Sequence, residues 1–371
     1  MPELVRALEF FAECELLSTW SFKRRRSPAS HAKNAWLLHY TLALYKRFPI
    51  LQCHNSSYLA LCKVFDHWLA ENLRENFDVL YFLSGCGLSA MHKAHKWGMK
   101  VVIESGSTHT DFQHRIVWEE YRRNGLKAPL FPEEYRRRVR QEFLMGDFIQ
   151  IPSEFVRSTY LAEGISEEKL LKAPYGVDVG NFVAKGKHDV SETFRVICPS
   201  GVNLRKGARV LVEAWRKLGW KPAEAELHWI GWPNHPEVRH LFKPALPGVI
   251  WHGWMPHEKL AALLRSNDAL VLPSFEEGLA RVLIEAAASG LALIATPNTG
   301  VEDFFTPGAP EGWLIPCNDV DALCAALEEA RADRQRTFLL GQRAAERSRH
   351  GYSWEDYGRR VTENFIKVLN A

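Results

Sequence analysis

One stretch of this 371-residue chain, residues 268–295, constrains the fold more than any other. An apolar segment, Asp268–Leu272, runs into a Pro-Ser turn, and Glu277-Gly278 then opens a helix that Gly290 ends. A second apolar segment, Leu291–Ala295, follows directly. Strand, helix and strand at this spacing predict one unit of a parallel α/β sheet.

The predicted helix start lies at the carboxyl edge of the sheet and suits an anion. Unpaired N–H groups and about half a positive charge favour a phosphate there. Glu277 precedes the helix and can reach past a phosphate to neutral hydroxyls, while Glu285 lies about 12 Å further along the axis and can reach a second hydroxyl pair. A nucleotide-sugar fits this layout, with the sugar at Glu277, the ribose at Glu285 and the diphosphate at the helix start formed by Gly278, Leu279 and Ala280.

A second loop, Pro199–Gly207, follows another predicted strand and has the composition of a phosphate-binding loop. Gly201 lets the backbone approach a diphosphate. Arg205 and Lys206 can neutralise the charge that develops on a leaving nucleotide. Taken alone, the loop is also compatible with a solvated turn, so its interpretation depends on the two glutamates downstream.

These motifs resemble those of the retaining family-4 glycosyltransferases of the GT-B fold, also called group 1 glycosyl transferases. Glu277-Gly278 and Glu285 resemble the Glu-x7-Glu motif, and Pro174–Asp178 resembles the Pro-Asn-Gly-Val-Asp turn that leaves the N-terminal domain, with Tyr175 replacing Asn. In the glycine loop, Val202 takes the position of the usual Arg, and Leu204–Gly207 looks like a variant with the Arg beside the Lys. The resemblance is strong over about residues 145–371 and weak before them.

The resemblance implies two further site residues. The turn Trp251–Pro256 would hold the base, with Trp254 beside it, although tryptophans at this edge also suit simple packing. His109 follows a strand of the first half and would lie near the transferred sugar, with an ordinary loop histidine as the alternative. The implied catalytic set is Glu277, Lys206, Arg205 and His109.

The implied fold is α/β, with two Rossmann-like, doubly wound parallel-sheet domains facing a cleft. We expect an N-terminal acceptor-side domain over residues 1–180, a nucleotide-sugar domain over 181–352, and a C-terminal helix over 353–371 that returns to the first domain. A chain of this length exceeds a single core. Strands in the second domain are expected at Phe194–Cys198, Glu226–Ile230, Val249–Trp251, Asp268–Leu272, Leu291–Ala295 and Trp313–Ile315.

The opening of the chain departs from the family pattern. Residues 4–12 have helical spacing, and the first strand is expected only near Glu15–Thr19. GT-B enzymes usually begin with a strand and a glycine loop, so the first strand of the sheet is expected to be missing. Truncation of a longer native chain is one explanation, and it would put the activity of this polypeptide in doubt. Residues 20–77 are predicted to be mostly helical, with a short strand at Ile50–Cys53.

Composition narrows the class of protein. Hydrophobic residues at 46% and charged residues at 25% indicate a soluble globular chain, and seven cysteines without a Cys-x-x-Cys pair argue against a disulfide framework or zinc ribbon. A net charge of +3 does not indicate a nucleic-acid partner. The cysteine pattern predicts a cytoplasmic protein. No apolar run reaches the ~20 residues that span a bilayer, so any membrane contact is expected to be peripheral.

Two local patterns leave alternatives open. The arginine-rich segment Glu133–Phe143 suits peripheral contact with an anionic membrane at its inner face, or a phosphate-bearing acceptor, or an ordinary solvated helix. His92 and His95 share a helix face, but no third ligand accompanies them. No metal site is therefore expected.

The predicted reaction moves a sugar from a UDP- or GDP-linked donor to a hydroxyl of a saccharide or lipid-linked acceptor, with retention, in bacterial-type polysaccharide or glycoconjugate synthesis. No carboxylate nucleophile is evident on the opposite face, so a front-side mechanism without metal or other cofactor is expected. The alternatives are a GT-B epimerase or phosphorylase, and a catalytically degenerate nucleotide-sugar-binding protein.

Overall fold

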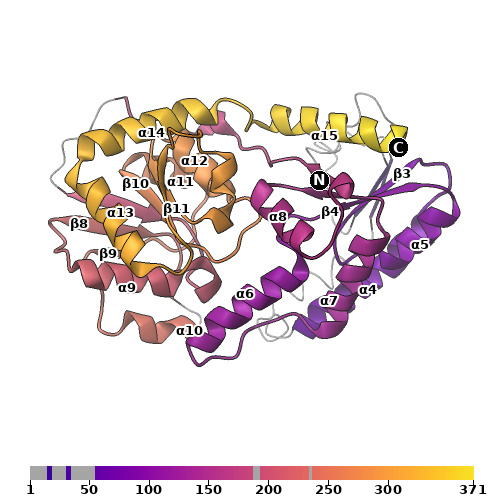
Figure 1. Cartoon of the computed structure of the whole chain (residues 1–371), viewed down its shortest axis with the longest axis horizontal. Helices are drawn as coiled ribbons and strands as arrows, with labels where there is room; N and C mark the ends of the chain where they lie inside the picture. Colours follow the sequence, from indigo (N-terminus) through magenta and orange to yellow (C-terminus); the bar gives the residue numbers. More distant parts are fainter. Residues whose placement is uncertain (1–14, 19–30, 35–54, 187–192, 234–235) are drawn as a thin grey trace.

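The computed structural model describes residues 15–18, 31–34, 55–186, 193–233 and 236–371. They form a four-stranded sheet, a six-stranded sheet and a separate two-stranded pair, all parallel (Figure 1). The strand expected near Glu15–Thr19 is β1, Glu15–Ser18, and it pairs with β2, His31–Asn34. Since β2 falls in a stretch expected to be helical, that expectation is corrected there. The predicted helix at 4–12 and strand at 50–53 lie outside the described residues.

The four-stranded sheet has the sequential order β3-β4-β5-β6, and side chains on its two faces belong to different clusters. Leu80 and Phe82 point to a core shared with the helices, whereas Val79 and Tyr81 point to the other face. The strands are β3 Val79–Leu83, β4 Lys100–Glu104, β5 Phe148–Ile151 and β6 Leu170–Lys172. The helices are α4 Asn55–Asn72, α5 Leu88–Lys96, α6 Thr110–Arg123, α7 Glu133–Met145, α8 Glu154–Ala162 and the short η1 Glu167–Lys169.

The C-terminal helix α15, Trp354–Asn370, covers that other face of the first sheet (Figure 1). Ser353 begins it with a capping box, because its hydroxyl accepts from the Asp356 N–H and the Asp356 carboxylate accepts from the Ser353 N–H. Its apolar stripe, Tyr357, Val361 and Phe365, is buried. The predicted return of this helix to the first sheet is therefore observed.

The six-stranded sheet has the order β12-β11-β10-β7-β8-β9, so the strand order reverses between β7 and β10. Such a switch point opens a crevice at the carboxyl ends of the two strands, and ligands of doubly wound sheets bind there. The strands are β7 Phe194–Cys198, β8 Ala225–Trp229, β9 Val249–Trp251, β10 Ala269–Leu272, β11 Ala292–Ala295 and β12 Gly312–Leu314. All six lie within one or two residues of the predicted positions.

The helices of this half cover both faces of the sheet (Figure 1). They are α9 Ala208–Leu218, α10 Pro236–Arg239, α11 His257–Arg265, α12 Arg281–Ala288, α13 Val320–Ala332 and α14 Arg334–Ser348. Short 3-10 turns are η2 Val179–Asn181, η3 Leu204–Lys206, η4 His240–Phe242, η5 Pro297–Thr299 and η6 Val301–Asp303. Helix α14 was not predicted from the sequence.

Helix α6 belongs to the first sheet's half but packs against the second (Figure 1). Val117 and Tyr121 are buried in the same cluster as the core of the six-stranded sheet. Arg209 of α9 donates to the fully buried carboxylate of Glu120, and the Tyr121 hydroxyl donates to Glu237. The two halves are thus joined by apolar and polar contacts. Within the described residues no helix is both long and apolar enough to cross a membrane.

Candidate active site

The loops after β7 and β10 meet at the switch point and are tied to each other. The Asn203 side chain caps η3 by accepting from the Lys206 N–H at 3.0 Å. Gly207 has a φ of 75°, and any side chain there would overlap the carbonyl of Pro273. The Phe275 N–H donates to the Arg205 carbonyl at 2.8 Å. Glycine is therefore required at position 207 by the close approach of the two loops, which places Lys206 beside the Pro-Ser turn.

Lys206 and Glu277 form an ion pair across this junction. Their side chains are 18% and 14% exposed, so the pair is largely withdrawn from water while one side remains open. Burial lowers the pKa of Lys206, and Glu277 opposes that effect. The Ser274 hydroxyl also donates to Glu277 at 3.3 Å. The structure thus brings together two residues that the sequence assigned to the same donor.

Arg205 is held differently, by the neighbouring glutamate. Its Nη1 donates to the carboxylate and to the carbonyl of Glu276, each at 2.9 Å. Glu276 is fully buried, and sequence reasoning gave it no role. Consecutive residues of an extended segment point to opposite sides. The adjacent glutamates Glu276 and Glu277 were therefore a sequence feature that indicated carboxylates on both sides of this segment.

The helix that follows starts later than predicted. Gly278–Ala280 are not helical, and α12 begins at Arg281. The reason lies in the next loop, because the Glu277 and Ala280 N–H groups donate to the carbonyls of Asn298 and Thr299, both at 3.0 Å. Ala280, at the N-cap, offers no side-chain cap to α12. The first turn of α12 is thereby left with N–H groups suited to an anion.

Glu285 lies on α12 as a buried carboxylate. Its side chain is 8% exposed, and His257 Nδ1 lies 3.8 Å from Oε1, beyond hydrogen-bond distance. Burial raises the pKa of Glu285, which His257 and Arg281 partly oppose. A buried carboxylate of this kind favours a ligand that donates hydroxyl hydrogen bonds. His257 begins α11, directly after the turn that the resemblance assigned to the base.

Two other predicted donor residues lie on exposed turns. Trp254 is 86% exposed and follows β9. Gly201 lies in the loop after β7, where its carbonyl accepts from the Asn203 N–H at 3.1 Å. Nothing in the protein covers Trp254 among the described residues, so its indole is available to a base at the edge of the crevice.

His109 is placed apart from these residues. It is the N-cap of α6, its Nδ1 accepts from the Asp111 N–H at 3.3 Å, and its ring packs against Phe143 and Tyr160. At 4% exposure it has a structural role that does not support the predicted contact with the sugar. Ligand atoms of His109, Asp111 and Glu163 lie within 4.8 Å of one another, a grouping that could hold a metal ion. However, Asp111 already pairs with Arg136 and Arg140, and Glu163 with Arg115, which satisfies these carboxylates without one.

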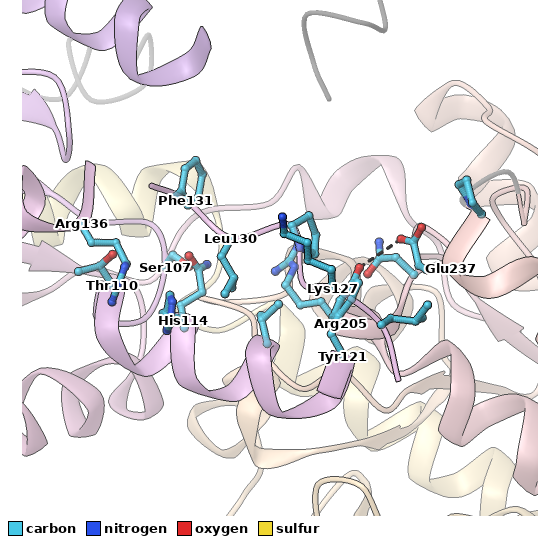
Figure 2. A pocket seen from close by; sticks show the side chains of 16 residues that line it. Ser107, Thr110, His114, Tyr121, Lys127, Leu130, Phe131, Arg136, Arg205 and Glu237 are labelled. Atoms are coloured by element: carbon cyan, nitrogen blue, oxygen red, sulfur yellow. Dashed lines mark hydrogen bonds between the residues drawn. The ribbon is translucent and has the colours of Figure 1, made fainter. Parts of the chain in front are cut away.

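A cavity of about 1060 Å³ adjoins Arg205 and is walled by both halves of the molecule (Figure 2). The first half contributes polar groups from α6 and apolar groups from the loop that follows α6. The second half contributes Asn203, Arg205, Pro236 and Glu237. Residues from the first half are Ser107, Thr110, Gln113, His114, Val117, Tyr121, Leu126, Lys127, Pro129, Leu130, Phe131 and Arg136. His114, rather than His109, is the histidine that faces this space.

Three of the four arginines of α7 are engaged in ion pairs within the protein. Arg138 pairs with Asp66, and Arg136 and Arg140 both pair with Asp111 and Glu133. Arg136 also lines the cavity. This arrangement favours a role in the cavity wall over a free basic surface, and membrane contact stays a prediction.

Two facing Rossmann-like domains, with two loops that meet at the switch point of the second and a C-terminal helix that returns to the first, are the architecture of the GT-B fold. Residues 193–333 match the family model described as glycosyl transferases group 1. That part of the chain therefore resembles a group 1 glycosyl transferase domain, in agreement with the resemblance predicted from its motifs.

Relatives and solved structures agree with this class. A colanic acid biosynthesis glycosyltransferase by name, WcaL of Salmonella typhimurium, is 27% identical over 61% of this chain, and the match spans 58% of WcaL. A Corynebacterium glutamicum protein named as a GDP-mannose-dependent phosphatidylinositol monomannoside mannosyltransferase is 25% identical over 80% of this chain and 78% of its own. The structure of Anabaena Alr3699/HepE with UDP and glucose superposes with a TM-score of 0.67 at 13% identity, covering 98% of this chain and 95% of HepE. The predicted GT-B fold is confirmed.

Proposed function

We propose that the protein is a retaining glycosyltransferase of the family-4 type, which transfers a sugar from a nucleoside-diphosphate donor to an acceptor hydroxyl. The observation that carries the proposal is the arrangement at the switch point. Arg205 and Lys206 stand on one loop, Glu277 stands on the other, and the buried carboxylate of Glu285 lies further along α12. This arrangement supports the layout of sugar, diphosphate and ribose that the sequence suggests.

In the proposed reaction the charge on the leaving diphosphate increases as the bond to the sugar breaks. Lys206, Arg205 and the uncapped first turn of α12 would stabilise that charge without reorganising, because they are already held in place. Glu277 would accept from sugar hydroxyls while paired with Lys206. The acceptor hydroxyl would approach from the cavity on the same face as the leaving group, and the leaving phosphate would take its proton. Retention follows from this front-side geometry.

The acceptor is proposed to occupy the cavity between the halves. Its walls offer the hydroxyl, amide and imidazole groups of Ser107, Gln113 and His114, together with the apolar surface of Leu130 and Phe131 (Figure 2). Such a mixture suits a saccharide, which presents hydroxyls at its edges and C–H groups on its faces. The names of the relatives, with colanic acid and a phosphatidylinositol mannoside among them, support an acceptor in polysaccharide or glycolipid synthesis.

The donor is proposed to be a UDP- or GDP-sugar. HepE was crystallised with UDP and glucose, and the Corynebacterium relative is named as GDP-mannose-dependent, so both bases have support. A thermal-shift screen of UDP-, GDP- and ADP-sugars tests the proposal, because a bound donor raises the melting temperature. Product analysis then separates transfer from epimerisation, which needs no acceptor, and from phosphorolysis, which needs free phosphate. An absence of any shift and any transfer would reject the proposal.

Glu285 gives this proposal a pH signature. If its carboxylate binds the ribose, Glu285→Gln should weaken UDP or GDP by about tenfold, the cost of one hydrogen bond to a charged group. It should leave inorganic pyrophosphate unaffected, since pyrophosphate has no ribose. Because burial raises the pKa of Glu285, nucleotide affinity should rise with pH from the ordinary glutamate range upwards, and the variant should lose that part of the dependence.

The contribution of Glu285 to the stability of the fold changes with pH in the opposite direction to nucleotide affinity. A carboxyl group whose pKa is raised in the folded state stabilises the fold below its unfolded pKa, and that contribution is lost as the pH rises through the folded pKa. Isothermal titration calorimetry across pH, with pyrophosphate as the reference ligand, measures the binding part. Equal losses for pyrophosphate and nucleotide in Glu285→Gln would contradict the ribose assignment.

A further inference from the structure

Glu276 is a charged residue at the junction of the two halves, and it is completely buried. Its Oε1 accepts from the Ser107 hydroxyl at 2.6 Å and from the Thr108 hydroxyl at 2.9 Å. Its Oε2 accepts from Gln113 Nε2 at 3.1 Å and from Arg205 Nη1 at 2.9 Å. Both oxygens are therefore used, and three of the four partners belong to the first half of the molecule.

The Glu276 carboxylate is ionised in this setting. Burial alone would raise its pKa, but Arg205 and the hydrogen bonds from Ser107, Gln113 and Thr108 hold the pKa below its ordinary value. A buried charge is tolerated only when it is paired and fully hydrogen-bonded. Separating the halves at this point would leave Glu276 with Arg205 alone, so the contact resists opening.

The partners of Glu276 have roles on both sides of the proposed reaction. Arg205 belongs to the diphosphate loop, while Ser107 and Gln113 line the cavity proposed for the acceptor. One guanidinium nitrogen of Arg205 is committed to Glu276, which leaves the rest of its planar donor set to face a phosphate. The side chain is 34% exposed and also lines the cavity. The Glu276 carboxylate thus connects Arg205, the proposed diphosphate ligand, to the wall of the cavity proposed for the acceptor.

We propose that Glu276 is a positioning residue, an interdomain clasp that holds Arg205 and the segment Ser107–Gln113 in one fixed relation. The proposal rests on the proposed function for what Arg205 and the cavity bind. Glu276 does not touch donor or acceptor, and it acts through the geometry of the residues that do. Loss of the clasp lets the two walls of the site move apart while each domain keeps its own fold.

The test compares two buried glutamates. Glu276→Gln keeps the size of the side chain and removes the charge of the clasp. Glu311→Gln is the matched control, because Glu311 is 2% exposed and accepts hydrogen bonds from the N–H and hydroxyl of Thr306, which also belongs to the second domain. For Glu276→Gln, kcat should fall about 20-fold, since small misplacements of reacting groups are costly. Affinity for UDP or GDP should stay within about threefold, and the maximum dimension from small-angle X-ray scattering should increase. Glu311→Gln should change the melting temperature but neither kcat nor the scattering curve.

A second variant changes the first-domain partners of Glu276 and leaves Glu276 itself in place. Ser107→Ala combined with Thr108→Val removes two donors to Glu276 and leaves its bond to Arg205 intact. The same fall in kcat and the same opening are expected, with nucleotide affinity preserved. Should both variants scatter like the wild type and turn over at its rate, the clasp does not exist. If the wild type binds neither UDP nor GDP, the proposed function fails instead. The scattering comparison then still shows whether Glu276 holds the two halves together.

Discussion

Replacing Lys206 by alanine is expected to lower the rate of sugar transfer roughly 100- to 1000-fold, the usual cost of removing one preorganised donor from a developing oxyanion. Lys206 would face the diphosphate, and its ammonium group also neutralises Glu277. Without it, Glu277 would remain as an unpaired, largely buried carboxylate beside a ligand of the same sign. Calorimetry with UDP or GDP should therefore show a large loss of affinity, in addition to the loss of turnover.

A double variant separates these two effects. Lys206→Ala with Glu277→Gln removes the unpaired carboxylate, so it should bind nucleotide more tightly than Lys206→Ala alone while remaining inactive. Glu277→Gln by itself should weaken the sugar-bearing donor more than the free nucleotide. If Lys206→Ala binds nucleotide within about twofold of the wild type, Lys206 is not the diphosphate ligand.

Much of the second domain could be predicted because its pattern is local. Apolar runs such as Phe194–Cys198 and Val249–Trp251 are separated by glycine turns and amphipathic helices, so hydrophobic periodicity and turn residues alone predict strands there. Strands β7 and β9 have those bounds. The position of Lys206 beside Glu277 follows from the same logic, since parallel strands on either side of a switch point bring their carboxyl ends together.

The parts that could not be predicted depend on contacts between distant residues. The start of α12 is displaced because the carbonyls of Asn298 and Thr299 capture N–H groups of the preceding turn. His109 caps its own helix and packs on Phe143, and a histidine after a strand carries no local signal for that orientation. Glu276 was visible as one of two adjacent glutamates, but its partners lie more than 160 residues away in the first half.

Gly278→Ala is expected to reduce transfer by about 100-fold or more with little effect on the stability of the fold. A side chain at this position would overlap the carbonyl of Gly106 and approach Pro152 at 3.3 Å, so the obstruction is mainly backbone of the first domain. The Ser153 hydroxyl also donates to the Gly278 carbonyl at 2.7 Å, which places this glycine in direct contact between the halves. Relief requires the two walls of the site to separate, and a displacement of about 1 Å can cost roughly 100-fold in rate.

The binding of free nucleotide should survive this change, because Lys206, Glu285 and the start of α12 all belong to the second domain. Gly186→Ala is the matched control, since a side chain there meets no atom of the described residues within 4 Å and the backbone is not left-handed. Melting temperature, calorimetry with UDP or GDP, and initial transfer rates should be measured for both variants. An active Gly278→Ala enzyme would show that the contact between Gly278 and Gly106 is not part of the transfer-competent arrangement, and the cavity beside Arg205 would then have to be reconsidered as the acceptor site.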